Sequence, residues 1–452
     1  MEILDPTLLV EPVMRTSPQG GRLDVLFVVD CFPPDEGGLE RYNAELAVRL
    51  HAAGHRVRVF AWDLGSEGAA QVDAALPFPV HRSATRLGPL GIEPTALAPA
   101  LRRWRPRVVF ASGTSVLLGA SIRVASRFAP VVVSVHDIRW LNSKGSLRKR
   151  LKHRLRFGLQ RARAIVVNSS DTRARVLTGE VAEERVSIVH PGVDSTRFRP
   201  DPDAGSRVRS TLGIGDRRML LTVAGLRRNK GHLRVLAVLE RLVRDFPDLA
   251  YVVVGDGELS EELHCKVQSR GLTQHVHLVG RVVDPSPYYN ACDVFVMPST
   301  NDHPKRPAAE GFGSAYLEAA ACGKPVIGSS SGGATDIVVE GRTGFLVSPR
   351  DDEALEKRLR WLLANPEGSR RMGVEGRRRV GLFQWEGAVA RLEAVLARAE
   401  LEAPWRRRWL GPRSLYIDRL PQQTPDRESR VPAAAPAEDL SPKDIEAQRS
   451  LG

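Results

Sequence analysis

Cysteine is scarce in this chain, and the four that occur are scattered along it: Cys31, Cys265, Cys292 and Cys322. They include no close pair at metal-ligand spacing, and their density is far below that of a disulfide-stabilised domain. We interpret them as small buried apolar residues. The sequence therefore predicts neither a zinc site nor a disulfide framework.

Long apolar runs are also missing. No segment reaches the roughly 18–20 consecutive apolar residues that a membrane-spanning helix needs. The first 20 residues contain Asp5, Glu11 and three prolines, where a secretory segment would be uniformly apolar. We therefore expect a cytoplasmic protein, with at most a peripheral position at the inner face of the cell membrane.

The charge balance favours basic residues, with a formal net charge of +13. Such an excess attracts anions, which include phosphates, acidic lipids and nucleic acids. Zinc-finger, K-homology and RNP-type signatures are absent, so we do not expect nucleic acid as a partner.

The length of 452 residues predicts two domains and a tail, and the balance of 42% apolar to 26% charged residues is globular. Short apolar runs alternate with helical-period stretches, first from Asp24 to about residue 190 and again from about residue 219. A proline-rich segment at 191–206 separates the two series. This alternation favours an α/β protein with two doubly wound parallel sheets in tandem.

A basic loop follows the first strand candidate of the second series. Residues 225–231 read Gly-Leu-Arg-Arg-Asn-Lys-Gly, and they place Arg227, Arg228 and Lys230 at the carboxyl end of that strand. Ligands of open parallel sheets bind at this edge, and such cations are suited to a diphosphate. The alternative is a solvated basic turn.

The most specific pattern is EGFGSAYLEAAACGKPVIG at 310–328. In one continuous helix Glu310 and Glu318 would lie roughly 80° apart. Gly311 and Gly313 instead predict that Glu310 lies in a loop and that a helix starts near Ser314, a good N-cap, with Glu318 one turn inside. Free amides at this helix start would face a phosphate or sugar hydroxyls.

The chemistry of this group suits a nucleotide sugar. Departure of a nucleoside diphosphate builds negative charge that fixed cations and helix-end amides stabilise. Carboxylates beside that phosphate are unfavourable unless they accept hydrogen bonds from hydroxyls, which sugars supply. The alternative is that Glu318 is a helix-surface residue and Glu310 a loop charge.

These residues resemble glycosyltransferase family 4, the retaining enzymes of the GT-B fold, over about residues 24–400. The resemblance implies that Glu310 contacts the donor sugar, that Glu318 binds the ribose hydroxyls and that Lys230 neutralises the diphosphate. It also implies that a run of backbone lines the sugar and diphosphate: Phe312, Gly313, Ser314 and Ala315. The family usually has an arginine where this chain has Gly225, and Arg227 or Arg228 is the candidate to replace it.

The first series adds two matching pieces. FPPDEGGLERYNAEL resembles the glycine-rich first loop of the family, in which Gly37 and Gly38 approach the diphosphate. VVVSVHD places His136 at the end of a strand, matching a histidine near the donor sugar and acceptor. A tight turn without function and a structural histidine are the alternatives.

The resemblance also implies a division of the chain. We expect an extension at 1–22, an acceptor-side domain at 23–195, a donor domain at 196–382, a crossover helix returning to the first domain at 383–403, and a disordered tail at 404–452.

The implied reaction moves a hexose from a GDP- or UDP-linked sugar to a lipid-linked, glycan or small-molecule hydroxyl acceptor. It retains the anomeric configuration and uses neither a metal nor a further cofactor; no Asp-x-Asp motif lies beside the donor-site candidates. Some segments resemble mannosyltransferases of lipid or polysaccharide assembly, which favours GDP-mannose. A nucleotide-sugar epimerase of the same fold and a non-catalytic sugar-nucleotide-binding module remain as alternatives.

One further segment, residues 144–164, predicts contact with an anionic membrane surface. Leu147, Leu151, Leu155 and Leu159 recur every four residues, and basic side chains crowd the remaining positions. Such a helix suits the headgroup region of a bilayer. The alternative is that these leucines pack on the first sheet.

Overall fold

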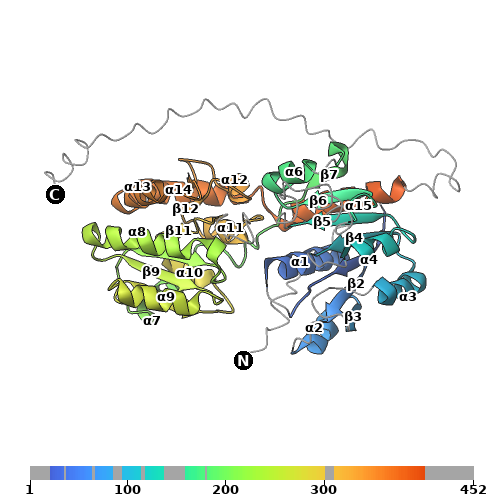
Figure 1. Cartoon of the computed structure of the whole chain (residues 1–452), viewed down its shortest axis with the longest axis horizontal. Helices are drawn as coiled ribbons and strands as arrows, with labels where there is room; N and C mark the ends of the chain where they lie inside the picture. Colours follow the sequence, from blue (N-terminus) through green and yellow to red (C-terminus); the bar gives the residue numbers. More distant parts are fainter. Residues whose placement is uncertain are drawn as a thin grey trace, which may run out of the picture. The chain divides into compact units, whose positions relative to one another are not determined.

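The computed structural model describes residues 21–34, 37–63, 67–84, 94–113, 118–136, 158–178, 181–300 and 310–402. These residues form two parallel sheets covered by helices on both faces (Figure 1). The predicted extension at 1–22 lies outside them except for its last two residues, and the predicted tail lies outside them entirely. No helix within these ranges is long and apolar enough to span a bilayer.

The first sheet has seven strands in the order β3-β2-β1-β4-β5-β6-β7. The order reverses between β1 and β4, which places the topological switch point of this sheet there. β1, β4 and β5 are buried almost throughout, as expected for central strands with helices on both sides. The strands are β1 (Asp24–Val29), β2 (Arg56–Asp63), β3 (Val80–Ala84), β4 (Val108–Ser112), β5 (Val131–Val135), β6 (Ala164–Val167) and β7 (Val186–Ile188).

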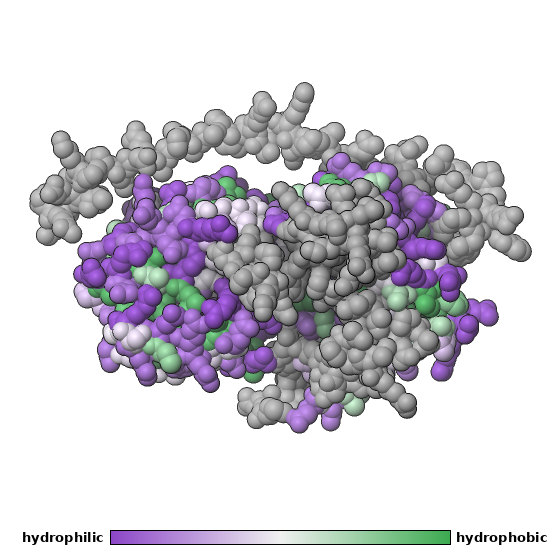
Figure 2. Space-filling view, viewed as in Figure 1, coloured by the Kyte–Doolittle hydropathy of each residue, from purple (hydrophilic) through white to green (hydrophobic). Residues whose placement is uncertain are grey.

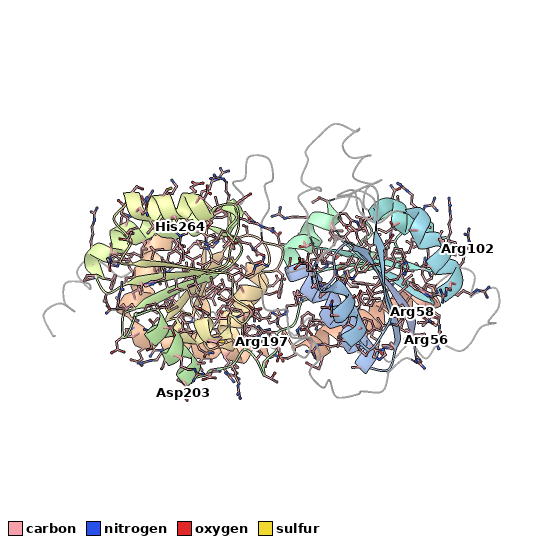
Figure 3. All side chains as sticks on the ribbon, turned by 90° about the horizontal axis from the view of Figure 1, so that it is seen from below. Arg56, Arg58, Arg102, Arg197, Asp203 and His264 are labelled. Carbon is pink, nitrogen blue, oxygen red and sulfur yellow. The ribbon has the colours of Figure 1, made fainter. Side chains whose placement is uncertain are left out.

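Charged residues at the start of the first two strands are paired. Asp24 is opposite Arg56 in the parallel register, and both Arg56 and Arg58 donate to its carboxylate, at 3.1 and 2.6 Å (Figure 3). The charges therefore lie at the amino edge of the sheet, away from the edge at which ligands bind.

Two hydrophobic clusters cover the two faces of the first sheet. One of them includes α1 and the distant C-terminal helix α15 (Trp385–Leu401), whose Leu392 and Leu396 are fully buried. The other helices here are α2 (Ala69–Ala75), α3 (Pro94–Trp104), α4 (Leu118–Ala125) and α6 (Ser170–Leu177), and α1 is Gly38–Ala52. The chain thus returns to its first sheet at its end.

The second sheet has six strands in the order β10-β9-β8-β11-β12-β13, with the switch point between β8 and β11. Its strands are β8 (Met219–Val223), β9 (Ala250–Val254), β10 (Val276–Gly280), β11 (Val294–Val296), β12 (Val326–Ser329) and β13 (Gly344–Val347). Its helices are α7 (Pro202–Thr211), α8 (His232–Asp245), α9 (Ser260–Ser269), α10 (Ser286–Ala291), α11 (Ser314–Ala321), α12 (Ala334–Ile337), α13 (Asp352–Ala364) and α14 (Pro366–Val380). The predicted fold class is confirmed: both sheets are parallel and doubly wound.

The two chain segments that connect the sheets lie side by side. The backbone N–H of Val193 donates to the carbonyl of Phe383 at 3.0 Å, and Val193 forms a bridge with Gln384. The exact boundaries of the predicted domains stay a prediction.

Helix ends follow local capping chemistry. Helix α14 begins at Pro366, because Asn365 accepts a hydrogen bond from the N–H of Gly368 at 2.9 Å and proline is tolerated in the first turn.

The predicted basic helix at 144–164 is mostly outside the described residues, which resume at Gly158. Its described end is not helical: residues 159–161 form a turn. Leu159 is buried in a core cluster with Ile165 and Val167 of β6. For this one leucine the core interpretation is right and the membrane stripe is wrong.

Candidate functional site

The loop after β8 packs against the segment that follows β11. A short 3₁₀ helix, Arg228–Lys230, ends at Gly231, whose φ of +82° favours glycine. A side chain at Gly231 would place its Cβ 2.4 Å from the carbonyl of Pro298. The N–H of Thr300 also donates to the carbonyl of Asn229 at 2.8 Å. Lys230 is therefore fixed at the switch point of the second sheet.

The glycine-rich loop after β11 is held by backbone contacts. The carbonyl of Glu310 accepts from the N–H of Gly333 at 2.9 Å. Gly333 approaches so closely that a Cβ there would lie 2.3 Å from the Cα of Phe312. The ring of Phe312 is buried beside His190 and Phe383, so only the backbone of Phe312 remains for a ligand.

Helix α11 begins at Ser314, but Ser314 is not its N-cap. The N-cap is Gly313, in the left-handed region at φ +86°, and no side chain caps the helix. The prediction of a serine cap is wrong, because the turn requires a residue with positive φ and that residue takes the cap position. The start of α11 therefore presents the backbone of Ser314 and Ala315 without a competing side-chain cap.

The predicted cation and the predicted loop carboxylate meet. Lys230 Nζ forms an ion pair with Glu310 Oε2, although the two residues are 80 positions apart. Both side chains are largely enclosed, at 21% and 14% exposure. A partly buried pair is strongly destabilised when one partner is removed, so each group holds the other in place until another ligand replaces it.

Glu318 is buried within α11, not displayed on its surface. Its Oε2 accepts from the hydroxyl of Tyr289 at 2.8 Å, and its Oε1 accepts from Arg41 Nη1 at 3.1 Å. Burial and the neighbouring Glu318 charge raise the pKa of Tyr289 well above its usual value, so this hydroxyl stays a donor. The predicted place one turn inside the helix is confirmed.

Arg41 and Tyr289 are two site residues that the sequence reasoning missed. Arg41 lies in the first turn of α1, three residues after the glycine pair, so its place beside that loop was a usable signal. Tyr289 gave none, since a buried tyrosine in a short helix reads as core.

His136 lies at the carboxyl end of β5, as predicted, and it is half-buried. Its Nε2 is 2.7 Å from the hydroxyl of Ser134, and the ring packs edge-on against Tyr42 at 4.6 Å. Burial lowers the pKa of His136 to about 3, so the imidazole is neutral at physiological pH. A Cβ at Gly311 would lie 2.7 Å from the carbonyl of His136, which brings this residue to the Glu310 loop.

The two glycines of the first loop behave differently. Gly37 is the N-cap of α1 with an extended backbone, and a Cβ there would meet the side chain of Glu40. A Cβ at Gly38 would meet nothing within 4 Å. Open space at Gly38 permits close approach of a ligand, while its predicted contact with a diphosphate stays a prediction.

Arg227 and Arg228 are the two candidates to replace the arginine that the family usually has at the position of Gly225, and the structure distinguishes them. Arg228 pairs with Glu262 on α9 at 2.6 Å. Arg227 is exposed, and its Nε lies 3.8 Å from where a Cβ of Gly225 would be. Arg227 is therefore the better placed of the two.

A second interdomain contact lies beside this site and was also not predicted. Asp336 of α12 accepts from the backbone N–H of Ser170 at 2.7 Å and lies 2.9 Å from His190 Nε2. These hydrogen bonds lower the pKa of Asp336 despite its burial, so the carboxylate is charged.

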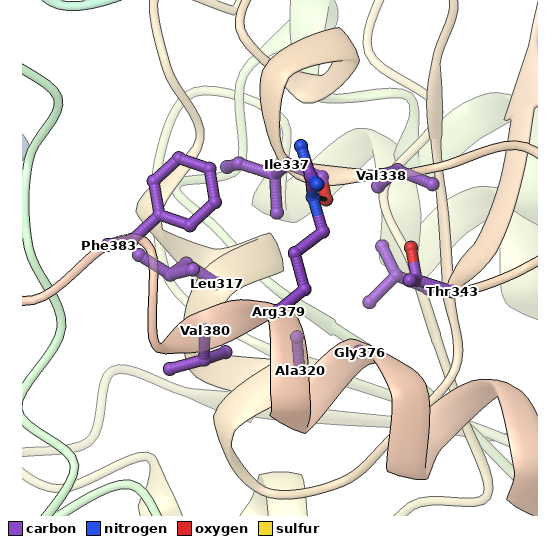
Figure 4. A pocket seen from close by; sticks show the side chains of 10 residues that line it. Leu317, Ala320, Ile337, Val338, Thr343, Gly376, Arg379, Val380 and Phe383 are labelled. Carbon is purple, nitrogen blue, oxygen red and sulfur yellow. Dashed lines mark hydrogen bonds between the residues drawn. The ribbon is translucent and has the colours of Figure 1, made fainter. Parts of the chain in front are cut away.

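The small cavity behind α11 is not the ligand site. It measures about 10 Å³, less than a sugar requires, and is lined mainly by apolar side chains such as Leu317, Ile337 and Phe383 around Arg379 (Figure 4). Within the described ranges no group of three or more His, Cys, Asp or Glu is arranged to hold a metal ion; the predicted independence from metals stays a prediction.

Comparison with known proteins identifies two glycosyltransferase family matches along the chain. Residues 207–379 match the family described as glycosyl transferases group 1, and residues 36–197 match glycosyltransferase family 4. The chain is 32% identical over 388 residues to the GDP-mannose-dependent alpha-(1-6)-phosphatidylinositol monomannoside mannosyltransferase of Mycolicibacterium smegmatis, which covers 82% of this chain and 98% of the relative. The protein of the same name in Mycobacterium tuberculosis is 29% identical over 386 residues, covering 82% and 97%.

Among solved structures, the complex of Anabaena Alr3699/HepE with UDP and glucose has a TM-score of 0.70 at 20% identity, covering 83% of this chain and 100% of that one. At this identity the likeness establishes the fold alone, which is GT-B. The near full-length match to curated transferases and the two family matches remove the epimerase and the non-catalytic module from the alternatives that the sequence left open. The chain is a glycosyltransferase that uses a nucleotide sugar, and it belongs to glycosyltransferase family 4.

Proposed function

We propose that this enzyme transfers mannose from GDP-mannose to a phosphatidylinositol-type glycolipid, with retention of the anomeric configuration. The substrate assignment rests on three relatives that match over 97–98% of their own lengths. Their names specify a GDP-mannose-dependent phosphatidylinositol monomannoside mannosyltransferase, which in one of them acts on the monoacylated form. Retention follows from family membership. A lipid acceptor supports a peripheral position at the inner face of the cell membrane.

The observation that carries the catalytic assignment is the ion pair of Lys230 and Glu310 at the switch point beside the start of α11. A diphosphate bound there would replace Glu310 as the partner of Lys230, and the backbone of Ser314 and Ala315 would add the positive end of the helix. Negative charge that develops on the leaving phosphate is then stabilised by groups already in position.

Glu310 changes partner in this scheme. Once Lys230 neutralises the phosphate, the carboxylate of Glu310 is free to accept hydrogen bonds from hydroxyls of the donor sugar. Charge-assisted hydrogen bonds of this kind are about twice as strong as neutral ones. The exchange leaves no unpaired charge, because each group gains a ligand partner as it loses the other.

Glu318 would accept the ribose hydroxyls of the nucleotide. A carboxylate has about four acceptor positions, and Tyr289 and Arg41 occupy two of them. Ribose is therefore able to bind without expelling both protein donors.

His136 would act as a neutral hydrogen-bonding group near the donor sugar. With a pKa of about 3 its imidazole does not exchange protons with the acceptor near pH 7. Deprotonation of the acceptor hydroxyl is left to the departing phosphate, as the family resemblance implies, and neither a metal nor a further cofactor takes part.

The test is a donor screen by thermal shift, followed by a transfer assay. GDP-mannose and GDP should raise the melting temperature more than UDP-glucose and UDP at equal concentration, because a ligand at 100 times its Kd adds about 2.7 kcal/mol. GDP should then be released only when a phosphatidylinositol mannoside is present, and the product should be an α-mannoside. Stabilisation by UDP ligands alone would overturn the donor assignment.

A further inference from the structure

Helix α14 (Pro366–Val380) has two faces of very different composition. Its buried face is made of small residues and two larger apolar ones: Gly368, Ser369, Met372, Gly373, Gly376 and Val380. The contact is close, since a Cβ at Gly373 would lie 2.0 Å from the carbonyl of Gly323. In Figure 1 the helix lies beside α13 in the layer that covers one face of the second sheet. The opposite face of α14 is exposed.

That outward face combines arginines with exposed apolar side chains. Arg370, Arg371, Arg377 and Arg378 are exposed and lie three or four positions from Val374 along the helix. Val374 is 66% exposed, and Leu382, just beyond the helix, is 64% exposed. No other large hydrophobic side chain in the described ranges is as exposed as these two. Elsewhere hydrophilic residues dominate the described surface visible in Figure 2.

Positive charge on this face is only partly neutralised. Arg371 pairs with Glu367, and Arg342 pairs with Glu375. The side chains of Arg370 and Arg378 have no hydrogen bond or ion pair with any residue that the structure describes. Three carboxylates thus oppose six arginines, which leaves three positive charges in excess: Arg342, Arg370, Arg371, Arg377, Arg378 and Arg379 against Glu367, Glu375 and Asp336, whose charge acts on Arg379.

A surface cavity of about 290 Å³ lies at the end of this face. It is lined by Val339, Arg342, Thr343, Glu375, Arg378, Arg379 and Leu382. Arg379 is fixed by its donation to the carbonyls of Asp336 and Ile337, at 2.8 and 2.9 Å. The cavity therefore has guanidinium groups on its walls and an exposed leucine at its rim.

We propose that this α14 surface, formed by the six arginines with Val374 and Leu382, docks on an anionic phospholipid bilayer. A headgroup phosphate would occupy the arginine-lined cavity, and Val374 and Leu382 would enter the boundary between headgroups and acyl chains. Arginine-rich faces with exposed apolar residues bind lipid interfaces because the charges attract anionic headgroups while the apolar side chains leave water.

The chemistry favours a lipid over other polyanions. A nucleic acid or an acidic polysaccharide would use the arginines but would gain nothing from two apolar side chains held in water. None of these residues belongs to the proposed donor site, so the inference goes beyond the proposed function and holds whichever nucleotide sugar is used.

The test is flotation of the full chain with phosphatidylcholine vesicles that contain phosphatidylglycerol, without any nucleotide. The charge variant is R370Q/R378Q, which removes two arginines without a partner. Its matched control is R207Q/R244Q, which removes two exposed arginines, on α7 and α8, whose guanidinium groups also lack a partner in the described residues. The apolar variant is V374S/L382S. Binding of GDP, measured separately, reports whether each variant keeps a folded donor domain.

The wild type should float with anionic vesicles, less at high salt, and not with pure phosphatidylcholine. The charge variant should bind on the order of tenfold or more weakly, since each of its two missing basic residues adds roughly fivefold at an anionic surface. The apolar variant should also bind more weakly, and the control should bind as the wild type does. Inorganic phosphate at millimolar concentration should not release the protein.

Four results would overturn the inference. They are no flotation of the wild type at low salt, equal flotation of the charge variant and the wild type, full release by inorganic phosphate alone, and equal loss in the control variant, which would show that only overall charge matters. Unchanged flotation of the apolar variant would refute the insertion of Val374 and Leu382. A protein that binds GDP and fails to float refutes this surface alone, whereas one that floats without binding GDP refutes the donor proposal alone.

Discussion

The two sheets have the same kind of topology but very different carboxyl edges. At the switch point of the second sheet the structure gathers an ion pair, a basic turn and an uncapped helix start. Among the described residues, the edge of the first sheet supplies glycines, a neutral histidine and the enclosed Asp30, and Arg41 reaches across from it to Glu318. Because a doubly wound sheet fixes only where loops converge, their residues decide which edge holds a charged ligand.

The largest effect that tests this difference is expected at Glu310. Glu310→Gln should lower kcat by on the order of a hundredfold, about 3 kcal/mol. The control is Glu262→Gln, which removes a carboxylate paired with the same basic loop through Arg228. Transfer kinetics of both variants decide the matter, and wild-type turnover in Glu310→Gln would sink the assignment.

Substitution of Lys230 should weaken the binding of GDP much more than the binding of guanosine. Lys230→Ala should weaken GDP binding by roughly 10- to 100-fold and guanosine binding far less, because only GDP carries the charge that a fixed ammonium attracts. Arg228→Ala is the control from the same turn and should change neither by much, since Arg228 is already paired with Glu262. Calorimetric titration measures all four values. Equal weakening of both ligands by Lys230→Ala would make Lys230 structural.

His136 and His232 lie at the carboxyl edges of the first and second sheets. Both should make the free energy of unfolding fall as the pH is lowered. Burial lowers the pKa of His136 to about 3 and that of His232, at the start of α8, to about 4. An unfolded histidine binds its proton near pH 6.5, whereas these two remain neutral in the fold, so acidification favours the unfolded chain.

Each histidine should therefore cost about 2 kcal/mol of unfolding free energy between pH 7 and pH 5. Urea unfolding of the wild type, His136→Gln and His232→Gln at both pH values checks this. Each variant should lose about 2 kcal/mol less than the wild type does on acidification. An identical loss in wild type and variants would mean that neither ring is buried as described.

The smallest effect is expected at Glu318 of α11, which pairs with Arg41 of α1. Glu318→Gln should weaken guanosine and GDP equally, by about fivefold or 1 kcal/mol, because ribose is common to both ligands. Arg41→Gln removes the partner from the first sheet and keeps the carboxylate, so it should change guanosine binding by less than twofold. If Arg41→Gln matched the loss of Glu318→Gln, the ion pair between the sheets, and not the carboxylate alone, would carry ribose binding.

Much of the fold follows from local patterns. Apolar runs of strand length and the glycine break between Glu310 and Ser314 were readable directly, and the loop place of Glu310 agrees with the structure. The cap of α11 was not, because serine is a good cap by composition whereas the positive φ of Gly313 is set by the packing of Tyr316 and Gly333 around the turn. Leu159 was ambiguous for a similar reason, since a leucine repeat does not reveal which surface covers it.

The sequence by itself determined which residue types stand at the ends of which strands, because strand and helix periods are local properties of the chain. Only the tertiary structure decided how they pair. Lys230 meets Glu310 across 80 positions, and Arg41 meets Glu318 across 277. Such pairs depend on the order in which β8 and β11 lie in their sheet and on how α1 meets α11, and no spacing along the chain records either.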